Sequence, residues 1–150
     1  MASEKFNRTT TVAADAATTW TALTDVDRLA GWVGILHDVK EIERLDTYTA
    51  VLEDRVGPFK LRADLSVDVT VPEEGVRVEV SASGRDRAVD SKIAIKAVLS
   101  LAESDGGTTV TLEGDYQVTG RVASMGGGII RKKADGVLDD FFTNAERELG

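Results

Sequence analysis

Few residues of this chain have side chains suited to catalysis. The sequence of 150 residues contains no cysteine and one histidine, His37. The lack of cysteine excludes disulfide scaffolds, thiol nucleophiles and iron–sulfur clusters, and too few ligands remain for the usual zinc sites. A Ser-His-Asp triad would have to use His37, whose simpler interpretation is a lone histidine at the surface or at a strand edge.

Two further polar residues occupy positions that point into the molecule. Asp54 shares the alternation of Leu52, so its carboxylate is predicted to face inward, where burial is costly and indicates a functional group. Its place at a strand end beside Gly57-Pro58 also gives water access. Tyr116 shares the alternation of its apolar strand neighbours and is predicted to be a core tyrosine with its hydroxyl at a wet edge.

A glycine triplet, Gly126-Gly127-Gly128, precedes the last apolar stripe of the chain. A phosphate-binding loop is disfavoured because no lysine follows in P-loop spacing and the G-x-G-x-x-G pattern is absent. Close approach of the backbone to a strand or a bound molecule, or a flexible helix start, are both consistent with the triplet.

The densest basic run is Arg131-Lys132-Lys133, in a chain whose net charge is -8. These three residues are candidates for docking to an acidic partner, a lipid headgroup or a membrane surface. The alternative is an ordinary solvated helix face.

Composition restricts the class of protein. Hydrophobic residues are 42% and charged residues 29%, which is typical of a globular domain, and the length predicts one domain over residues 1–150. The acidic net charge disfavours nucleic acid as a partner. The polar first eleven residues do not resemble a signal peptide, and no apolar run is long enough to span a membrane, so we expect a cytoplasmic protein.

Apolar and polar residues alternate with a period of two through most of the chain, which predicts an antiparallel sheet with one buried face. The pattern is clearest over residues 59–71. Turns containing glycine or proline separate the runs. The predicted strands cover residues 6–12, 39–45, 48–56, 59–71, 76–82, 89–101 and 110–118.

Helices are predicted at three places. Asp15 and Asp25 are N-cap candidates for short helices over residues 16–23 and 26–31. A long amphipathic helix is predicted over residues 121–149, with an irregular start because of the glycines. Six or more strands that each have one apolar face need a single long apolar element to cover that face. We therefore predict an α+β helix-grip fold, a curved antiparallel sheet wrapped around the C-terminal helix, with two short helices after the first strand.

The predicted inner face is rich in small residues, which favours either an apolar cavity or a collapsed core. Strand parity and helical spacing predict the residues that would line such a cavity. They are Trp20, Leu23, Trp32, Leu52, Ala63, Leu65, Val80, Ile95, Leu112, Tyr116, Met125 and Ile129. The triplet Gly126, Gly127 and Gly128, together with the loop 32–36, is predicted to form a portal, with Arg131, Lys132 and Lys133 beside it as a docking patch.

Several short motifs recur in a known order: residues 17–25, Val56-Gly57-Pro58-Phe59-Lys60, Gly84-Arg85-Asp86-Arg87, Gly107-Thr108-Thr109-Val110, residues 120–126 and Phe141-Phe142. In their order and spacing, these motifs resemble the carbon monoxide dehydrogenase CoxG family of the START-like (SRPBCC) superfamily. The likeness covers nearly the whole chain. Three departures from the family are the missing prolines that often precede the first helix, Trp32-Val33-Gly34-Ile35 where many members have Pro-Gly, and an end at Gly150, where some members continue into a tail that helps membrane attachment.

The resemblance implies an apolar ligand cavity and no catalytic motif. Our leading hypothesis is non-enzymatic carriage of a hydrophobic small molecule of the lipid or isoprenoid quinone class, with no resident cofactor or metal. The resemblance also implies association with a carbon monoxide dehydrogenase-like molybdenum hydroxylase, in membrane recruitment or quinone handling, at the inner face of the membrane.

Two alternatives remain open at this point. One is a cavity enzyme of the polyketide cyclase or dehydratase type, for which Asp54, Tyr116, Ser91 and His37 are the candidate polar residues. The other is a pure protein-interaction subunit with a filled core.

Overall fold

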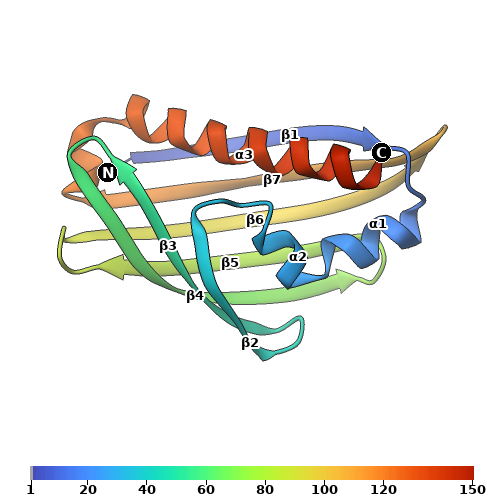
Figure 1. Cartoon of the computed structure of the whole chain (residues 1–150), viewed down its shortest axis with the longest axis horizontal. Helices are drawn as coiled ribbons and strands as arrows, with labels where there is room; N and C mark the ends of the chain where they lie inside the picture. The colour runs from blue at the N-terminus through green and yellow to red at the C-terminus, as the bar shows by residue number, and fades with distance from the viewer. Residues whose placement is uncertain (1) are drawn as a thin grey trace.

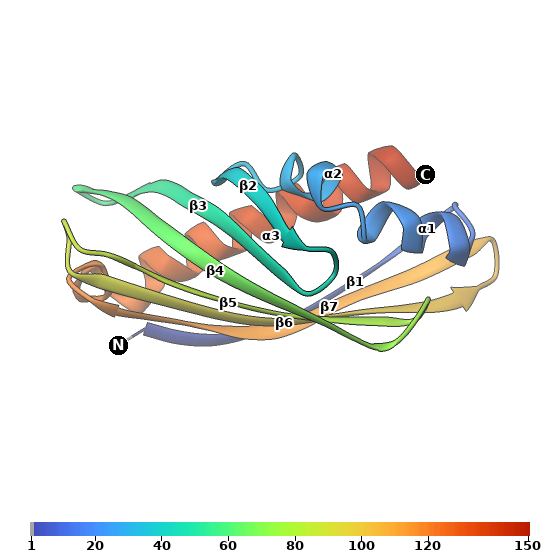
Figure 2. The same cartoon turned by 90° about the horizontal axis from the view of Figure 1, so that it is seen from below.

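The fold was analysed in a computed structural model that describes residues 2–150. Seven antiparallel strands form one sheet in the order β1-β7-β6-β5-β4-β3-β2. The sheet curls at its β2–β3 end toward the side that carries α1, α2 and α3 (Figures 1 and 2). The elements are β1 (Ala2–Val12), α1 (Ala16–Leu23), α2 (Val26–Ala30), β2 (Leu36–Glu43), β3 (Thr47–Val56), β4 (Phe59–Glu73), β5 (Arg77–Asp86), β6 (Ser91–Ser104), β7 (Gly107–Gly120), the 3-10 helix η1 (Val122–Met125) and α3 (Gly127–Leu149).

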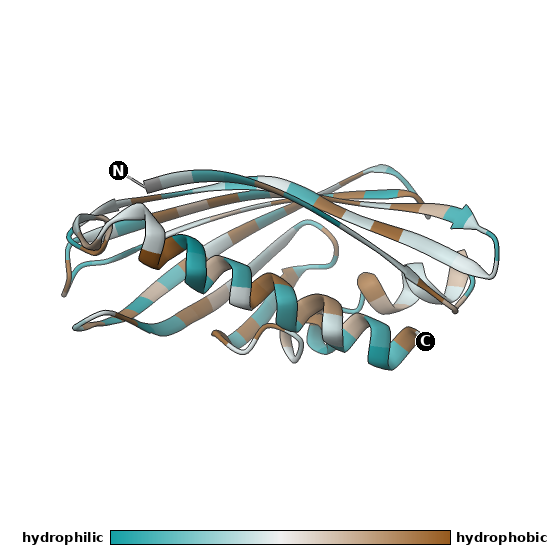
Figure 3. Ribbon diagram, turned by 90° about the horizontal axis from the view of Figure 1, so that it is seen from above, coloured by the Kyte–Doolittle hydropathy of each residue, from teal (hydrophilic) through white to brown (hydrophobic). Residues whose placement is uncertain are grey.

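This arrangement confirms the predicted helix-grip fold, with α3 as the long cover. Buried and exposed residues alternate along most of β4, and hydrophobic and hydrophilic positions alternate on the ribbon (Figure 3). Asp15 caps α1 by accepting a hydrogen bond from the Thr18 amide at 2.8 Å, and Asp25 caps α2 by accepting from the Arg28 amide at 3.3 Å.

Two of the differences from the predicted boundaries bear on the candidate site. The predicted continuous helix 121–149 is divided, because Gly126 has a φ of 97°, a left-handed conformation that ends η1 and that glycine adopts without strain. The strand predicted over residues 39–45 begins at Leu36, which places His37 inside β2.

Two glycines in the sheet allow the strands to approach closely where the sheet bends. A Cβ atom at Gly114 would lie 2.0 Å from the Lys96 carbonyl oxygen, and one at Gly84 would lie 2.2 Å from the Asp64 carbonyl oxygen. Neither position therefore tolerates a side chain without displacement of the neighbouring backbone. Gly84 and Gly114 of the inner face thus allow neighbouring strands to lie close together, and they also leave space beneath the helix.

The helix α3 is held along β1 and at its C-terminal end. Arg8 of β1 pairs with Asp135 and Asp139, and Glu4 pairs with Arg131 at 2.7 Å. At the other end, the backbone amides of Ala13 and Ala14 donate to the carbonyl oxygens of Gly150 and Leu149 at 2.7 and 2.8 Å. The C-terminal end of α3 is thereby joined to the segment that follows β1.

The apolar interior consists of two clusters. One lies under α1, α2 and the C-terminal half of α3, where Trp32 packs edge-on against Phe141 with ring centroids 5.6 Å apart, and Phe141 packs likewise against Phe142. The other lies under the N-terminal half of α3 and includes Tyr116 and Ile130.

Candidate functional site

The second cluster surrounds a partly open cavity of about 260 Å³ between the sheet and the N-terminal half of α3. Strands β1, β3, β4, β6 and β7 supply its sheet wall, Ile35 one rim, and α3 its cover. The lining is apolar except for Asp54, Lys133 and Tyr116. A larger groove, of about 830 Å³, opens on the opposite face of the sheet, where charged side chains such as Lys5, Glu79 and Asp115 line it. An apolar ligand matches the first site and not the second.

Four of the twelve predicted lining residues border this cavity: Leu52, Ile95, Leu112 and Tyr116. Ala63 and Leu65 are buried in the same cluster without bordering the cavity. Of four others, Leu23 and Trp32 belong to the first cluster, and Trp20 and Val80 pack against it. Parity separates the two faces of a strand and does not fix the position along it, so residues at both ends of the sheet fulfil the same pattern.

The two predicted lining residues nearest the start of α3 are placed differently. Ile129 is 39% exposed, because it lies one residue off the buried stripe in the first turns of α3, and Ile130 takes the inward position. Met125 lies over the β3–β4 turn, where a Cβ atom at Gly57 would lie 2.4 Å from its Cε atom. The prediction that Ile129 and Met125 line the cavity is therefore wrong.

An ion pair crosses the opening of the cavity between α3 and β3. The Lys133 ammonium donates to Asp54 Oδ1 at 3.3 Å, and the same oxygen accepts from the Arg55 amide at 2.8 Å. The two side chains are 47% and 21% exposed, so the pair lies where the cavity meets solvent. The inward parity of Asp54 was predicted, whereas its partner is 79 positions away and no spacing in the sequence signals it.

Tyr116 is 8% exposed, and its hydroxyl is buried with no hydrogen-bond partner among residues 2–150. Burial raises the pKa of Tyr116 above its ordinary value, and the nearby Glu4 carboxylate raises it further, against the opposing effect of the Arg131 guanidinium. The hydroxyl is therefore neutral at physiological pH. The predicted wet edge for this oxygen is wrong, because α3 covers it.

The other two candidates for a catalytic group lie elsewhere. Ser91 is buried, but its hydroxyl donates to the Val89 carbonyl oxygen at 3.1 Å and accepts from the Val122 amide at 2.9 Å, which joins β6 to η1. His37 is exposed on β2. The four polar residues considered for a cavity enzyme thus do not converge on one point.

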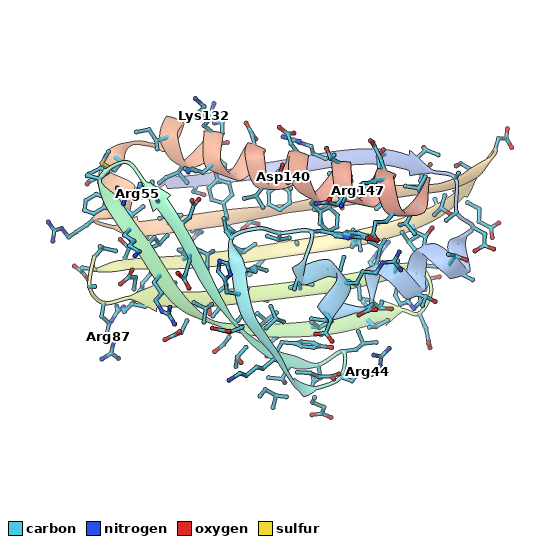
Figure 4. All side chains as sticks on the ribbon, in the orientation of Figure 1. Arg44, Arg55, Arg87, Lys132, Asp140 and Arg147 are labelled. Carbon is cyan, nitrogen blue, oxygen red and sulfur yellow. The ribbon has the colours of Figure 1, made fainter. Side chains whose placement is uncertain are left out.

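The predicted portal and docking residues are also spread out. A Cβ atom at Gly126, Gly127 or Gly128 would meet nothing within 4 Å, so close backbone approach is not their role. The loop that starts at the buried Trp32 reaches the cavity only through Ile35. Of the basic run, Arg131 pairs with Glu4 and Lys133 with Asp54, while Lys132 points away from the molecule (Figure 4).

Comparison with known proteins assigns the family. The model of the family described as the CoxG subunit of carbon monoxide dehydrogenase matches residues 9–150. The chain belongs to the CoxG family. This membership confirms the resemblance drawn from the short motifs. A search of curated proteins finds no match for this CoxG-family chain.

Solved structures show the same fold at low sequence identity. A conserved protein from Geobacillus kaustophilus is similar with a TM-score of 0.84 at 20% identity, over 97% of this chain and 95% of that one. A START superfamily protein from Mycobacterium smegmatis is similar with a TM-score of 0.70 at 15% identity, over 97% and 96%. The CoxG-family chain therefore has a START-like fold. No helix within residues 2–150 combines the length and the apolar character that crossing a membrane requires.

Proposed function

We propose that this CoxG-family protein binds a small apolar molecule in the cavity beneath α3 and carries it without chemical change. The observation that supports this most directly is the cavity itself, of about 260 Å³ with an almost wholly apolar lining. An apolar cavity of about 150 Å³ already binds benzene. The larger volume here suits a molecule of one or two rings, or one section of a longer lipid or isoprenoid quinone whose remainder leaves through the opening.

Family membership supports a partner for this carrier. The name of the CoxG family refers to carbon monoxide dehydrogenase. We extend the proposal to delivery of the ligand to a carbon monoxide dehydrogenase-like molybdenum hydroxylase, or to its recruitment to the membrane, at the cytoplasmic face. The net charge of -8 argues against nucleic acid as a partner.

Carriage accounts for the site better than the two alternatives do. A cavity enzyme needs its acid, base and polarising groups within reach of one reacting atom. Here Ser91 is used in a structural link, His37 is exposed, and Asp54 is paired with Lys133. A pure interaction subunit with a filled core does not need the partly open space beneath α3.

Binding of the neutral fluorescent probe N-phenyl-1-naphthylamine tests the carrier function. Ala134 of α3 borders the cavity, so Ala134→Phe should fill it and weaken binding at least ten-fold. Asp140→Phe, on the exposed side of the same helix, is the matched control and should bind as the parent does. Mass spectrometry of molecules that co-purify with the native protein would identify the class of ligand.

The proposal fails if the parent does not bind the probe, or if Ala134→Phe binds it as tightly as the parent. A turnover that depends on Asp54 or on His37 would favour the cavity enzyme. We expect His37→Gln to leave both stability and probe binding unchanged, because an exposed side chain contributes little to either.

A further inference from the structure

The polar groups at the cavity opening restrict the ligand further than its apolar wall does. Asp54 and Lys133 border the same cavity as Ile35 and Val137, and they are the two charged side chains among its described lining residues. Both are partly exposed, whereas the Tyr116 hydroxyl is covered. A ligand that places its apolar part inside must therefore leave its opposite end beside a carboxylate and an ammonium.

We propose that this ion pair selects ligands with an uncharged polar end group, such as a hydroxyl, ester, amide or ketone, over the corresponding acids and amines. The inference rests on the proposed carrier function and specifies the substrate class of the same site. An uncharged group can accept a hydrogen bond from Lys133, and a hydroxyl or amide can also donate one to Asp54. A carboxylate end group is attracted by Lys133 but repelled by Asp54, and an ammonium end group is attracted by Asp54 but repelled by Lys133. Neither ion therefore gains a net attraction that compensates for the hydration it loses.

The geometry makes the two charges act together. Asp54 Oδ1 is oriented by the Arg55 amide at 2.8 Å, so the carboxylate stays at the opening even when Lys133 moves. Of the two neighbouring cations of the helix, Arg131 lies on the opposite side of α3, where it pairs with Glu4 of β1, and Lys132 points away from the molecule. Neither of them therefore offsets the carboxylate at the opening.

The ion pair between Lys133 and Asp54 can also be broken by a ligand at little cost in free energy. Partly exposed ion pairs contribute little to stability, since water screens them and the long lysine side chain loses entropy when it is held. With 47% of its side chain exposed, Lys133 can turn from Asp54 to an incoming oxygen atom with little loss. The end group of the ligand then replaces Asp54 as the hydrogen-bond acceptor of Lys133.

Three probes with one naphthalene ring system test this selection: 2-(2-naphthyl)ethanol, 2-naphthylacetic acid and 2-(2-naphthyl)ethylamine, titrated at neutral pH into the full chain. The parent should bind the alcohol more tightly than either ion. Asp54→Asn should improve binding of the acid, and Lys133→Met that of the amine, each by about two- to five-fold. Lys132→Met removes an exposed charge of the same helix that does not border the cavity, and should change none of the three affinities.

The outcomes separate this inference from the carrier function. If the parent prefers one of the ions, or if Asp54→Asn does not improve binding of the acid and Lys133→Met does not improve that of the amine, the selection is disproved while carriage stands. If the parent binds none of the three probes and does not bind the hydrocarbon 2-ethylnaphthalene, the carrier function itself fails, and the selection fails with it.

Discussion

Tyr116 is the least expected side chain of the interior, because its buried hydroxyl has no hydrogen-bond partner in the part of the chain that the structure describes. Buried polar groups are almost always hydrogen-bonded, because an unmade hydrogen bond in a low-dielectric interior is costly. The ring fills space beneath α3 beside Ile130, so packing retains the residue even though its oxygen is unsatisfied. Tyr48 contrasts with it, since its hydroxyl accepts a hydrogen bond from the Leu45 amide at 2.6 Å.

Removal of the Tyr116 hydroxyl should therefore stabilise the protein or leave its stability unchanged. We expect Tyr116→Phe to keep or raise the free energy of unfolding, whereas Tyr48→Phe, which loses a satisfied hydrogen bond, should lower it by about 1 kcal/mol. Urea unfolding of both variants at neutral pH measures the difference. A loss in Tyr116→Phe as large as that in Tyr48→Phe would show that the hydroxyl has a partner in solution.

The same residue gives a signature at high pH. The folded state holds the Tyr116 proton more tightly than the unfolded chain does, because its folded pKa is raised above the ordinary value of 10.0. The folded state thus binds more protons than the unfolded chain, and stability falls as the pH rises from about 10 towards the folded pKa. Unfolding measured at about pH 9 and 11 should show a smaller loss in Tyr116→Phe than in the parent. Equal losses would mean that Tyr116 titrates normally.

Residue pattern predicted the side of the sheet on which a residue lies, but not its partner. The alternation of β3 and β7 correctly placed Asp54 and Tyr116 inward. The pairing of Asp54 with Lys133 depends on how α3 lies over the sheet, a tertiary relation that local periodicity does not contain.

At the scale of elements, α3 is held unequally on its two sides. Towards β1 it has the pairs of Arg131 with Glu4 and of Arg8 with Asp135 and Asp139, and the Thr10 hydroxyl donates to Glu146 at 2.5 Å. Towards β3, one ion pair joins it among the described residues, that of Lys133 with Asp54. Separation of α3 from β3 therefore breaks fewer polar contacts than separation from β1, and the cavity opens on that side.

The glycines at the start of α3 should set how fast the cavity opens. Alanine in a helix is about 1 kcal/mol more favourable than glycine, and a Cβ atom at Gly127 or Gly128 would meet nothing within 4 Å. We expect Gly127→Ala combined with Gly128→Ala to slow probe exchange in stopped-flow measurements more than it changes equilibrium affinity. Gly126 is left unchanged because alanine would be strained at its φ of 97°. Unchanged exchange rates would exclude the helix start as part of the portal.

The helices α1, α2 and α3 could be predicted because N-cap residues and the spacing of apolar residues are local features of the sequence. Asp15 and Asp25 occupy the cap positions that were predicted from the sequence. The position of the break at Gly126 could not be predicted, since three successive glycines give the same propensity and only the direction of the chain after η1 decides which of them turns.

At the scale of the whole molecule, the cations are unevenly distributed. Figure 4 shows Arg55, Arg87 and Lys132 directed outward at the end of the molecule where α3 begins, whereas Arg44 and Arg147 lie towards the opposite end. None of Arg55, Arg87 and Lys132 has an ion pair among residues 2–150, unlike Arg131 and Lys133 of the predicted docking patch. An acidic protein thus presents a cationic end next to its cavity.

We expect the end of the molecule that carries Arg55, Arg87 and Lys132 to dock on an anionic membrane surface, the role proposed from the sequence for the run Arg131-Lys132-Lys133. Arg55→Glu combined with Lys132→Glu should weaken sedimentation with vesicles that contain anionic lipid, and the binding of the parent should fall as salt rises, because salt screens exposed charges. Arg44→Glu is the matched control at the other end. If the double variant binds like Arg44→Glu, docking uses another surface or a protein partner.

The backbone clamp between the Ala13–Ala14 segment and the end of α3 also has a mechanical consequence. Because the C-terminal end of α3 is fixed, the helix can rotate as a rigid body about that end. A helix of 23 residues is about 34 Å long, so a rotation of roughly 5° about its C-terminal end moves its N-terminal end by about 3 Å. That displacement is comparable to the Lys133–Asp54 distance, and it lifts the N-terminal turns over the second cluster while leaving the aromatic packing around Phe141 nearly in place. A rotation that is too small to disturb the first apolar cluster is thus large enough to uncover the second cluster and its cavity.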